Sequence, residues 1–155
     1  MKKKILFVCL GNICRSPAAH GIMQQMVDEA GVGDRIYIDS AGMGGWHVGH
    51  LPDNRMRKHA AWRHYDLTHR ARQFRADDFE KFDYIFVMDE ENYYDVARMA
   101  PSEEAMQKVR YLAHCLRHHP EDHIIPDPYY GGDQGFEHVL DLLEDACEAL
   151  LEELA

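Results

Sequence analysis

The segment VCLGNICRSP places a cysteine, Cys9, and an arginine, Arg15, at the two ends of a five-residue stretch. The planar fork of an arginine suits two oxygens of a phosphate. A cysteine in such a positive environment favours its thiolate form, which is the nucleophile. The helix that follows adds free backbone N–H groups and a dipole that attract an anion. The segment therefore predicts a phosphate-binding loop that holds Cys9 against phosphorus.

The residues between Cys9 and Arg15 fit such a loop. Gly11 lets the backbone turn inward without a Cβ clash, and Asn12 tolerates a left-handed conformation while its side chain braces the loop. Leu10 and Ile13 flank the phosphate. A buried cysteine at a strand end is the alternative for Cys9, and the spacing to Cys14 does not match a CxxC metal site.

Strands and helices alternate around this loop. The apolar runs predict strands at 5–8, 36–38, 84–88 and 108–112, and helical spacing predicts helices at 16–30, 53–64, 91–99 and 135–154. Ser16 and Pro17 suit the N-cap and first position of the first helix, and Gly31 suits its end. The alternation favours a parallel sheet with helices on both sides, whose ligands bind at the carboxyl ends of the strands. Cys9 and Asp89 fall at such ends.

Length and composition bound the class of protein. The 155 residues favour one domain spanning 1–155, and the net charge of -10 argues against a nucleic-acid binder. No apolar run approaches a membrane span, so we expect a cytoplasmic protein without membrane insertion. Basic residues crowd the stretch from Arg55 to Arg75, either as a solvated face or as a patch that attracts an anionic substrate.

These motifs resemble the low-molecular-weight protein tyrosine phosphatases. The resemblance rests on FVCLGNICRSP, on DSAG with WHVG after it, and on HRARQ at 69–73, VMDEEN at 87–92 and DPYYGG at 127–132. It implies a single flavodoxin-like domain with a four-stranded parallel sheet. It also implies hydrolysis of phosphotyrosine in proteins and of small aryl phosphates through a phosphocysteine, with inorganic phosphate as product and inhibitor. Neither a cofactor nor a metal is expected, because Arg15 supplies the cation.

The resemblance implies that Asp127 is the general acid. Pro126 and Pro128 restrict its backbone, and by itself such a segment is only a turn. With the cysteine loop, it is expected to protonate the departing phenol and then to activate water. A positioned carboxylic acid typically contributes about 10²–10⁴-fold.

Other roles are carried over from the resemblance by motif position. Ser40 and His69 are expected to hold Asn12 and so the shape of the loop. The Ser16 hydroxyl is expected to stabilise the Cys9 thiolate, in addition to its place at the helix start. Asp89, with Asn92, is expected to support the site structurally.

The side chains around the phosphate loop are expected to determine which substrate binds. Trp46, Tyr129 and Tyr130 are candidates for an aromatic slot, although each also suits simple packing on its own loop. Ile13 stands where the arginine-phosphatase branch carries threonine, so an aryl ring is favoured over a guanidinium group. Cys14 either captures oxidised Cys9 as a reversible disulfide or fills the helix start as a buried residue.

Three alternative functions stay open. A protein arginine phosphatase and an arsenate reductase share the fold and the cysteine loop. The reductase needs closely spaced downstream cysteines, and Cys115 and Cys147 are far apart in the sequence. A phosphotyrosine-binding module without turnover is disfavoured by the intact Cys9, Arg15 and Asp127. We expect a monomer or a weak dimer.

Overall fold

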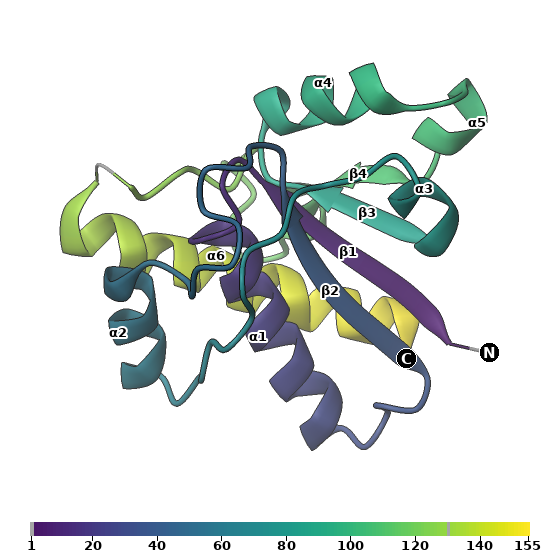
Figure 1. The fold of residues 1–155 in the computed structure, drawn as a ribbon. Coiled ribbons are helices and arrows are strands. Elements are labelled where there is room, and N and C mark those ends of the chain that lie inside the picture. The colour runs from purple at the N-terminus through teal and green to yellow at the C-terminus, as the bar shows by residue number, and fades with distance from the viewer. Residues whose placement is uncertain (1, 130) are drawn as a thin grey trace.

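A four-stranded parallel sheet forms the centre of the computed structural model, which describes residues 2–129 and 131–155. Its strands are β1 (Lys3–Cys9), β2 (Ile36–Gly42), β3 (Tyr84–Val87) and β4 (Val109–Tyr111), in the spatial order β2-β1-β3-β4. Every neighbouring pair is parallel, so the carboxyl ends of all four strands meet at one edge. The fold class predicted from the sequence is therefore confirmed (Figure 1).

The residues of β1 alternate between two cores, because successive side chains of a strand point to opposite faces. Ile5 and Phe7 join the core built with α1 (Arg15–Glu29) and α6 (Gly132–Leu154). Leu6 and Val8 join the core built with α3 (Asp78–Lys81) and α4 (Glu90–Met99). Helices therefore cover both faces of the sheet, and β1 is buried on both sides.

The remaining elements lie at the margins of these layers. Helix α2 (Asn54–Trp62) packs against α6, and α5 (Glu103–Met106) precedes β4. The predicted fourth strand was too long at its end, because Leu112 already begins a 3-10 helix, η1 (Leu112–Cys115). Four-residue helices such as α3 and α5 were missed, since one turn leaves no periodicity to detect. No helix within the described ranges is long and apolar enough to cross a bilayer.

The start of α1 differs from the prediction. The helix begins at Arg15 with Cys14 at the N-cap position, and no side chain caps it. Ser16 is therefore not the N-cap, because its hydroxyl is used in the interior next to Cys9. At the other end, Gly31 lies just past the helix with φ +72°, a conformation that suits glycine, as expected.

Candidate active site

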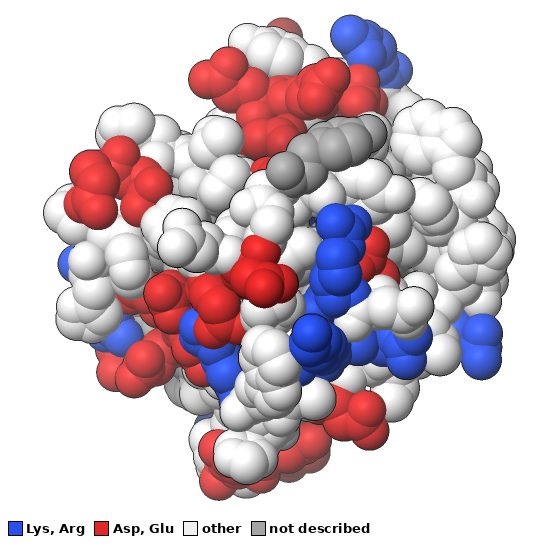
Figure 2. All heavy atoms as spheres, turned by 90° about the vertical axis from the view of Figure 1, so that its left-hand side faces the viewer, with Lys and Arg blue, Asp and Glu red and all other residues white. Residues whose placement is uncertain are grey.

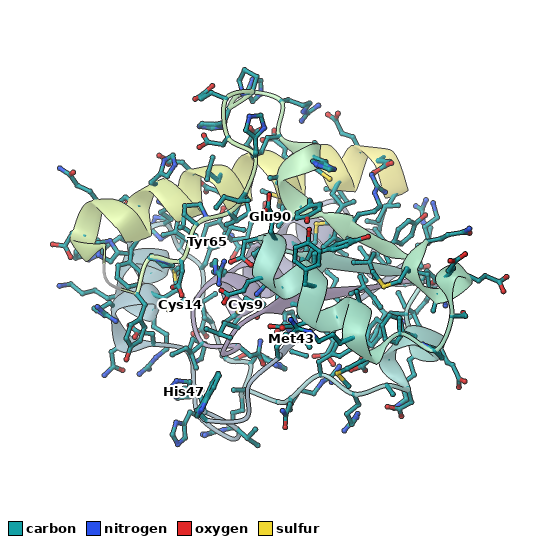
Figure 3. The ribbon with its side chains drawn as sticks, turned by 90° about the horizontal axis from the view of Figure 1, so that it is seen from above. Cys9, Cys14, Met43, His47, Tyr65 and Glu90 are labelled. Atoms are coloured by element: carbon teal, nitrogen blue, oxygen red, sulfur yellow. The ribbon has the colours of Figure 1, made fainter. Side chains whose placement is uncertain are left out.

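The loop between β1 and α1 lies at the carboxyl edge of the sheet, where Cys9 ends the strand (Figure 3). It forms the floor of a cavity of about 250 Å³. The lining residues are Cys9, Leu10, Gly11, Ile13, Cys14, Arg15, Trp46, His47, Asp127 and Tyr129. The candidate nucleophile, arginine and acid thus share one cavity, although Asp127 is far from the other two in the sequence.

Hydrogen bonds turn the peptide groups of the loop. The carbonyl oxygens of Cys9, Leu10 and Ile13 accept from the backbone N–H groups of residues 43, 44 and 53, at 3.0, 2.8 and 2.8 Å. In a trans peptide, the N–H of the next residue points opposite to the carbonyl. The N–H groups that follow these carbonyls therefore point away from the segments that contain residues 43, 44 and 53. Such N–H groups form a cradle for an anion.

Asn12 holds the bend of the loop. It is fully buried and adopts a left-handed backbone, with φ 57°. Its Nδ2 donates to Ser16 Oγ at 2.7 Å, while its Oδ1 accepts from His69 Nε2 at 3.1 Å and from the Arg72 N–H at 3.0 Å. These three bonds satisfy the side chain and offset the strained backbone conformation.

The structure alters one expected partner of Asn12. His69 bonds to Asn12 as predicted, but the serine that does so is Ser16. Ser40 is buried beneath the loop, and its hydroxyl hydrogen-bonds with His20 Nδ1 at 3.1 Å instead. Burial lowers the pKa of His20 to about 4, and the nearby His69 adds to this effect.

Gly42 makes close packing of β2 against the loop possible. A Cβ at this position would lie 2.8 Å from the backbone nitrogen of Asn12 and 2.8 Å from the carbonyl carbon of Gly11. Backbone atoms cannot yield as a flexible side chain would. The glycine of the DSAG segment is therefore required by the neighbouring loop, and sequence reasoning gave it no role.

Ser16 directs two polar groups at the sulfur of Cys9. Its Oγ lies 3.0 Å from Cys9 Sγ, and its backbone N–H donates to the same sulfur at 3.5 Å. Because Asn12 already donates to the Ser16 oxygen, the hydroxyl hydrogen points to an acceptor, either the Cys9 sulfur or the carbonyl oxygen of Ala41 at 3.4 Å. Both groups favour a negative charge on Cys9.

Arg15 is buried and held by fixed partners. Its Nη1 donates to Asp89 Oδ2 at 2.6 Å and to the carbonyl of Ile125 at 3.0 Å. Burial alone would lower the pKa of Arg15, but Cys9, Asp89 and Asp127 raise it overall. The guanidinium is thus a permanent cation whose orientation is set before any ligand binds.

Asp89 performs two tasks with its two oxygens. Oδ1 accepts from the Asn92 N–H at 2.8 Å and caps α4, while Oδ2 holds Arg15. Asn92 in turn accepts from the Met88 N–H at 3.2 Å. The VMDEEN segment therefore fixes both the helix start and the arginine.

Asp127 lies at the mouth of the cavity. Its Oδ1 accepts from the Tyr129 N–H at 3.0 Å, a local turn that holds the side chain. Its Oδ2 lies 3.8 Å from Arg15 Nη2, and the side chain is 43% exposed. The carboxyl group therefore faces both the arginine and solvent, where a leaving group would depart.

The walls combine aromatic and basic side chains. Trp46 is 69% exposed and folds back over Gly44, where an added Cβ would lie 1.8 Å from its ring. Arg55 Nη1 donates to the Tyr129 carbonyl at 2.8 Å, and its guanidinium lies 4.9 Å from the centre of the Tyr129 ring. Trp46 and Tyr129 thus both line the cavity, while the predicted Tyr130 lies outside the described residues.

The basic stretch from Arg55 to Arg75 is largely engaged with the chain's own acids. Arg63 pairs with Glu137 at 2.7 Å, and Arg72 pairs with both Asp39 and Asp78 at 3.0 Å. Figure 2 shows lysine and arginine atoms gathered near the middle of one face, with aspartate and glutamate beside them. These pairs reduce the field that the stretch offers to an anionic substrate.

The three other cysteines are buried thiols. Burial raises the pKa of Cys14, with Asp53 and Cys9 adding to the effect, and burial also raises the pKa of Cys115 and Cys147. All are free in the structure. Of these, Cys14 lines the same cavity as Cys9.

The parallel sheet, with a cysteine-containing loop at the carboxyl ends of its strands, defines an α/β protein whose site has the groups to hold an anion beside a thiol. A family model described as low molecular weight phosphotyrosine protein phosphatase matches residues 4–155. A Synechocystis protein that bears the name of this family is 50% identical over 151 residues, covering 97% of this chain and 96% of that protein. The chain therefore belongs to the low molecular weight phosphotyrosine protein phosphatase family.

Solved structures agree with this assignment. A protein tyrosine phosphatase from Entamoeba histolytica superposes with a TM-score of 0.94 at 42% identity, covering 99% of this chain and 97% of that chain. A Drosophila arginine phosphatase superposes with a TM-score of 0.88 at 36% identity, with the same coverage of both chains. The same fold therefore occurs in proteins named for two different phosphorylated residues.

Sequence reasoning missed several residues that build the site. His47 lines the cavity, the Ile125 carbonyl holds Arg15, and Arg55 anchors the segment that carries Asp127. The Arg72 N–H bonds to Asn12, and the HRARQ segment was the available signal for that contact. A backbone carbonyl leaves no signal in residue types, so the role of Ile125 required the structure.

Proposed function

We propose that this chain hydrolyses phosphotyrosine in proteins, with Cys9 as nucleophile, Arg15 as phosphate ligand and Asp127 as general acid and base. The observation that carries the proposal is the shared cavity. Cys9, with two polar groups of Ser16 on its sulfur, lies on the floor, Arg15 lies beside it, and Asp127 lies at the mouth. The nucleophile must reach phosphorus, the cation must reach the phosphoryl oxygens, and the acid must reach the leaving oxygen, so all three side chains must line one cavity.

In the first step the Cys9 thiolate attacks phosphorus in line. An S–P bond forms while the bond from phosphorus to the phenolic oxygen breaks, and Asp127 gives its proton to that oxygen. Arg15 and the N–H groups of the loop bind the phosphoryl oxygens through the transition state. Arg15 supplies the positive charge that balances the phosphoryl oxygens.

In the second step water attacks the phosphocysteine. Asp127, now a carboxylate, accepts a proton from the water, and the S–P bond breaks to release inorganic phosphate. The Ser16 hydroxyl and N–H stabilise the thiolate as it leaves. Inorganic phosphate fits the same cradle and is expected to inhibit as a competitive product.

Aromatic walls support an aryl substrate. Trp46 and Tyr129 flank the entrance and offer flat apolar surfaces to a phenyl ring. Ile13, which also lines the cavity, offers no polar group to a guanidinium. Arginine phosphatase activity is the second candidate because the Drosophila arginine phosphatase shares the fold.

Two other candidates receive less support. For arsenate reduction, Cys115 in η1 and Cys147 in α6 would have to relay a disulfide, but neither lines the cavity of Cys9. A binding module without turnover would need Arg15 to hold the phosphate, but it would need neither the nucleophile Cys9 nor the acid Asp127. We further propose a cytoplasmic monomer or weak dimer that acts on phosphoproteins.

A hydrolysis panel tests the proposal. Peptides that carry phosphotyrosine, phosphoserine or phosphoarginine are compared, together with arsenate reduction, for the wild type and for Cys9→Ser. We expect turnover of the phosphotyrosine peptide by the wild type only, with unchanged circular dichroism in the variant. Tight binding without turnover by the wild type, or equal turnover by Cys9→Ser, would contradict the mechanism.

A further inference from the structure

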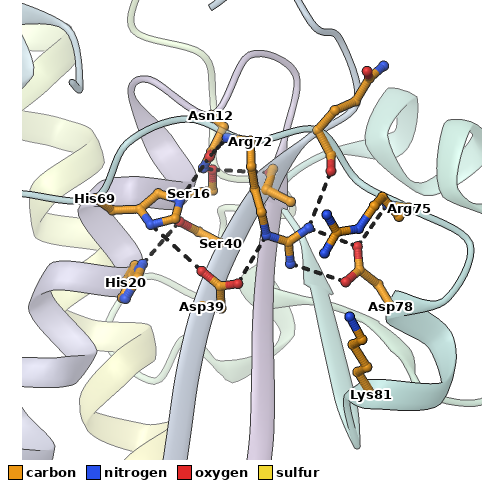
Figure 4. Close-up of polar contacts among 12 residues, drawn as sticks. Asn12, Ser16, His20, Asp39, Ser40, His69, Arg72, Arg75, Asp78 and Lys81 are labelled. Carbon is orange, nitrogen blue, oxygen red and sulfur yellow. Dashed lines mark hydrogen bonds and ion pairs between the residues drawn. The ribbon is translucent and has the colours of Figure 1, made fainter. Parts of the chain in front are cut away.

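His20, Asp39 and His69 come together beside the catalytic loop, although none of them lines the cavity of Cys9 (Figure 4). They come from α1, from β2 and from the segment before α3. One ligand atom from each lies within 4.8 Å of the other two. All three side chains are partly exposed, so the cluster is not sealed in the core.

The hydrogen bonds of His69 determine which of its nitrogens can bind a cation. The Arg72 N–H can only donate, so the Asn12 atom that it contacts is the amide oxygen, an acceptor. His69 Nε2 contacts the same oxygen at 3.1 Å and must therefore carry a hydrogen. In a neutral ring this leaves the lone pair on Nδ1.

That lone pair faces a carboxylate. His69 Nδ1 lies 3.7 Å from Asp39 Oδ1, and both atoms are acceptors when the ring is neutral. A cation between them would relieve this opposition. His20 brings a further imidazole, whose ring centre lies 4.9 Å from that of His69.

The donor set has a recognisable chemical preference. Two imidazole nitrogens and one carboxylate oxygen match the three-ligand sites of Zn²⁺, in which water takes the fourth position. A cavity of about 430 Å³, lined by His20 and His69, provides room for water and a path from solvent. Arg72 opposes a cation, but it is paired with Asp39 Oδ2 and with Asp78, which leaves Asp39 Oδ1 for the site.

We propose that His20, Asp39 and His69 bind a divalent transition metal of the Zn²⁺ type. The metal-bound His69 keeps its Nε2–H bond to Asn12, as metal-binding histidines commonly donate their second N–H to an oxygen. The metal therefore connects to the phosphate loop through His69 and stabilises the loop. It takes no part in the chemical step.

Binding is measured in the Cys9→Ser protein, because the thiolate would otherwise bind the metal itself. Zn²⁺ is titrated by calorimetry, and Co²⁺ is added as a spectroscopic probe of four-coordinate geometry. We expect one site, with affinity reduced about tenfold or more in His20→Gln and in His69→Gln. The control is His138→Gln, which should leave the affinity unchanged. His138 lies on α6, and its Nε2 is 3.8 Å from Asp122 Oδ1 in the loop that precedes this helix.

Thermal unfolding gives a second readout, since a ligand that binds only the folded state raises its stability. Zn²⁺ should raise the Tm of the Cys9→Ser protein and of its His138→Gln form, and should not raise that of its His20→Gln form. Circular dichroism without metal verifies that each variant is folded. Equal Zn²⁺ affinity in the His20→Gln and His138→Gln proteins, or no binding in Cys9→Ser, would overturn the proposal.

Discussion

Arg15 Nη1 donates to Asp89 Oδ2 at 2.6 Å, and this bond joins the catalytic loop to the start of α4. The other oxygen of Asp89 caps that helix. The residue that caps the helix after β3 therefore also orients the guanidinium of Arg15, which is proposed to bind phosphate. The contact links two carboxyl ends of the parallel sheet, at β1 and β3.

Asp89→Asn should separate the two tasks of this residue. Asparagine caps helices as well as aspartate does, so its amide oxygen can keep the cap of α4 while Arg15 loses its charged partner. The loss of negative charge loosens Arg15, and kcat/KM for an aryl phosphate should fall by about tenfold or more. Ser102→Ala, which removes the cap of α5, should instead cost about 1 kcal/mol of stability and leave kcat/KM intact. A fall in Tm without a fall in kcat/KM for Asp89→Asn would refute the positioning role.

Asp127→Ala should reduce turnover in a way that depends on the leaving group. For phenyl phosphate and phosphotyrosine the loss should be about 10²–10⁴-fold, because their phenolate needs a proton. For p-nitrophenyl phosphate the loss should be smallest, because that leaving group needs little protonation. Rates are measured across a series of substituted phenols. A uniform loss across the series would remove Asp127 from the acid role.

Ile13→Thr should shift the choice between phosphotyrosine and phosphoarginine. The branched apolar side chain lines the cavity and favours an aryl ring, whereas the threonine hydroxyl can bind a guanidinium. The kcat/KM ratio of tyrosine to arginine substrates should therefore fall in the variant. Faster hydrolysis of phosphoarginine than of phosphotyrosine by the wild type would reverse the assignment of Ile13.

Cys14→Ala should lose recovery from peroxide if Cys14 captures oxidised Cys9. Cys9 sulfenic acid and the Cys14 thiol would condense to a disulfide and release water, and added dithiol would restore both thiols. Because burial raises the pKa of Cys14, its thiolate is scarce at neutral pH, and capture should accelerate as pH rises. Activity is measured after peroxide and reductant, with Cys147→Ala as the buried-cysteine control. Equal recovery in Cys14→Ala and the wild type would exclude the disulfide.

The contact between His119 and Asp145 should make stability depend on pH. His119 Nδ1 lies 2.9 Å from Asp145 Oδ2, which raises the pKa of His119 above its usual 6.5. Burial would raise the pKa of Asp145, but His119 and the N–H groups of residues 117 and 118 lower it below 3.8 overall. The contribution of His119 is complete below about pH 6.5 and is lost as pH rises through its raised pKa. That of Asp145 is complete above about pH 4 and is lost as pH falls.

The Tm difference between wild type and His119→Gln should therefore be largest between about pH 4 and 6.5 and should shrink above that window. Thermal unfolding at a series of pH values measures it, with His138→Gln as the control. A Tm difference that does not change with pH would show that packing, rather than the ion pair, stabilises this segment.

The sequence by itself determined the class of fold and the chemistry of the loop. Alternating strands and helices are local patterns, and the run from Cys9 to Arg15 keeps its nucleophile and cation within one loop whatever surrounds it. Parallel pairing is then favoured, because a helix between two strands supplies the long crossover that parallel neighbours need. The four strands and the long helices were accordingly predicted close to their observed positions.

The tertiary structure decided which distant groups meet at that loop. Hydrogen-bond partners such as Asp89 for Arg15, Ser16 rather than Ser40 for Asn12, and the Ile125 carbonyl depend on sub-ångström placement. Residue types do not encode that placement. The cluster of His20, Asp39 and His69 likewise has no sequence spacing, because it forms where a helix, a strand and a loop cross. Local periodicity reports the elements, whereas contacts between them exist only after the whole chain has packed.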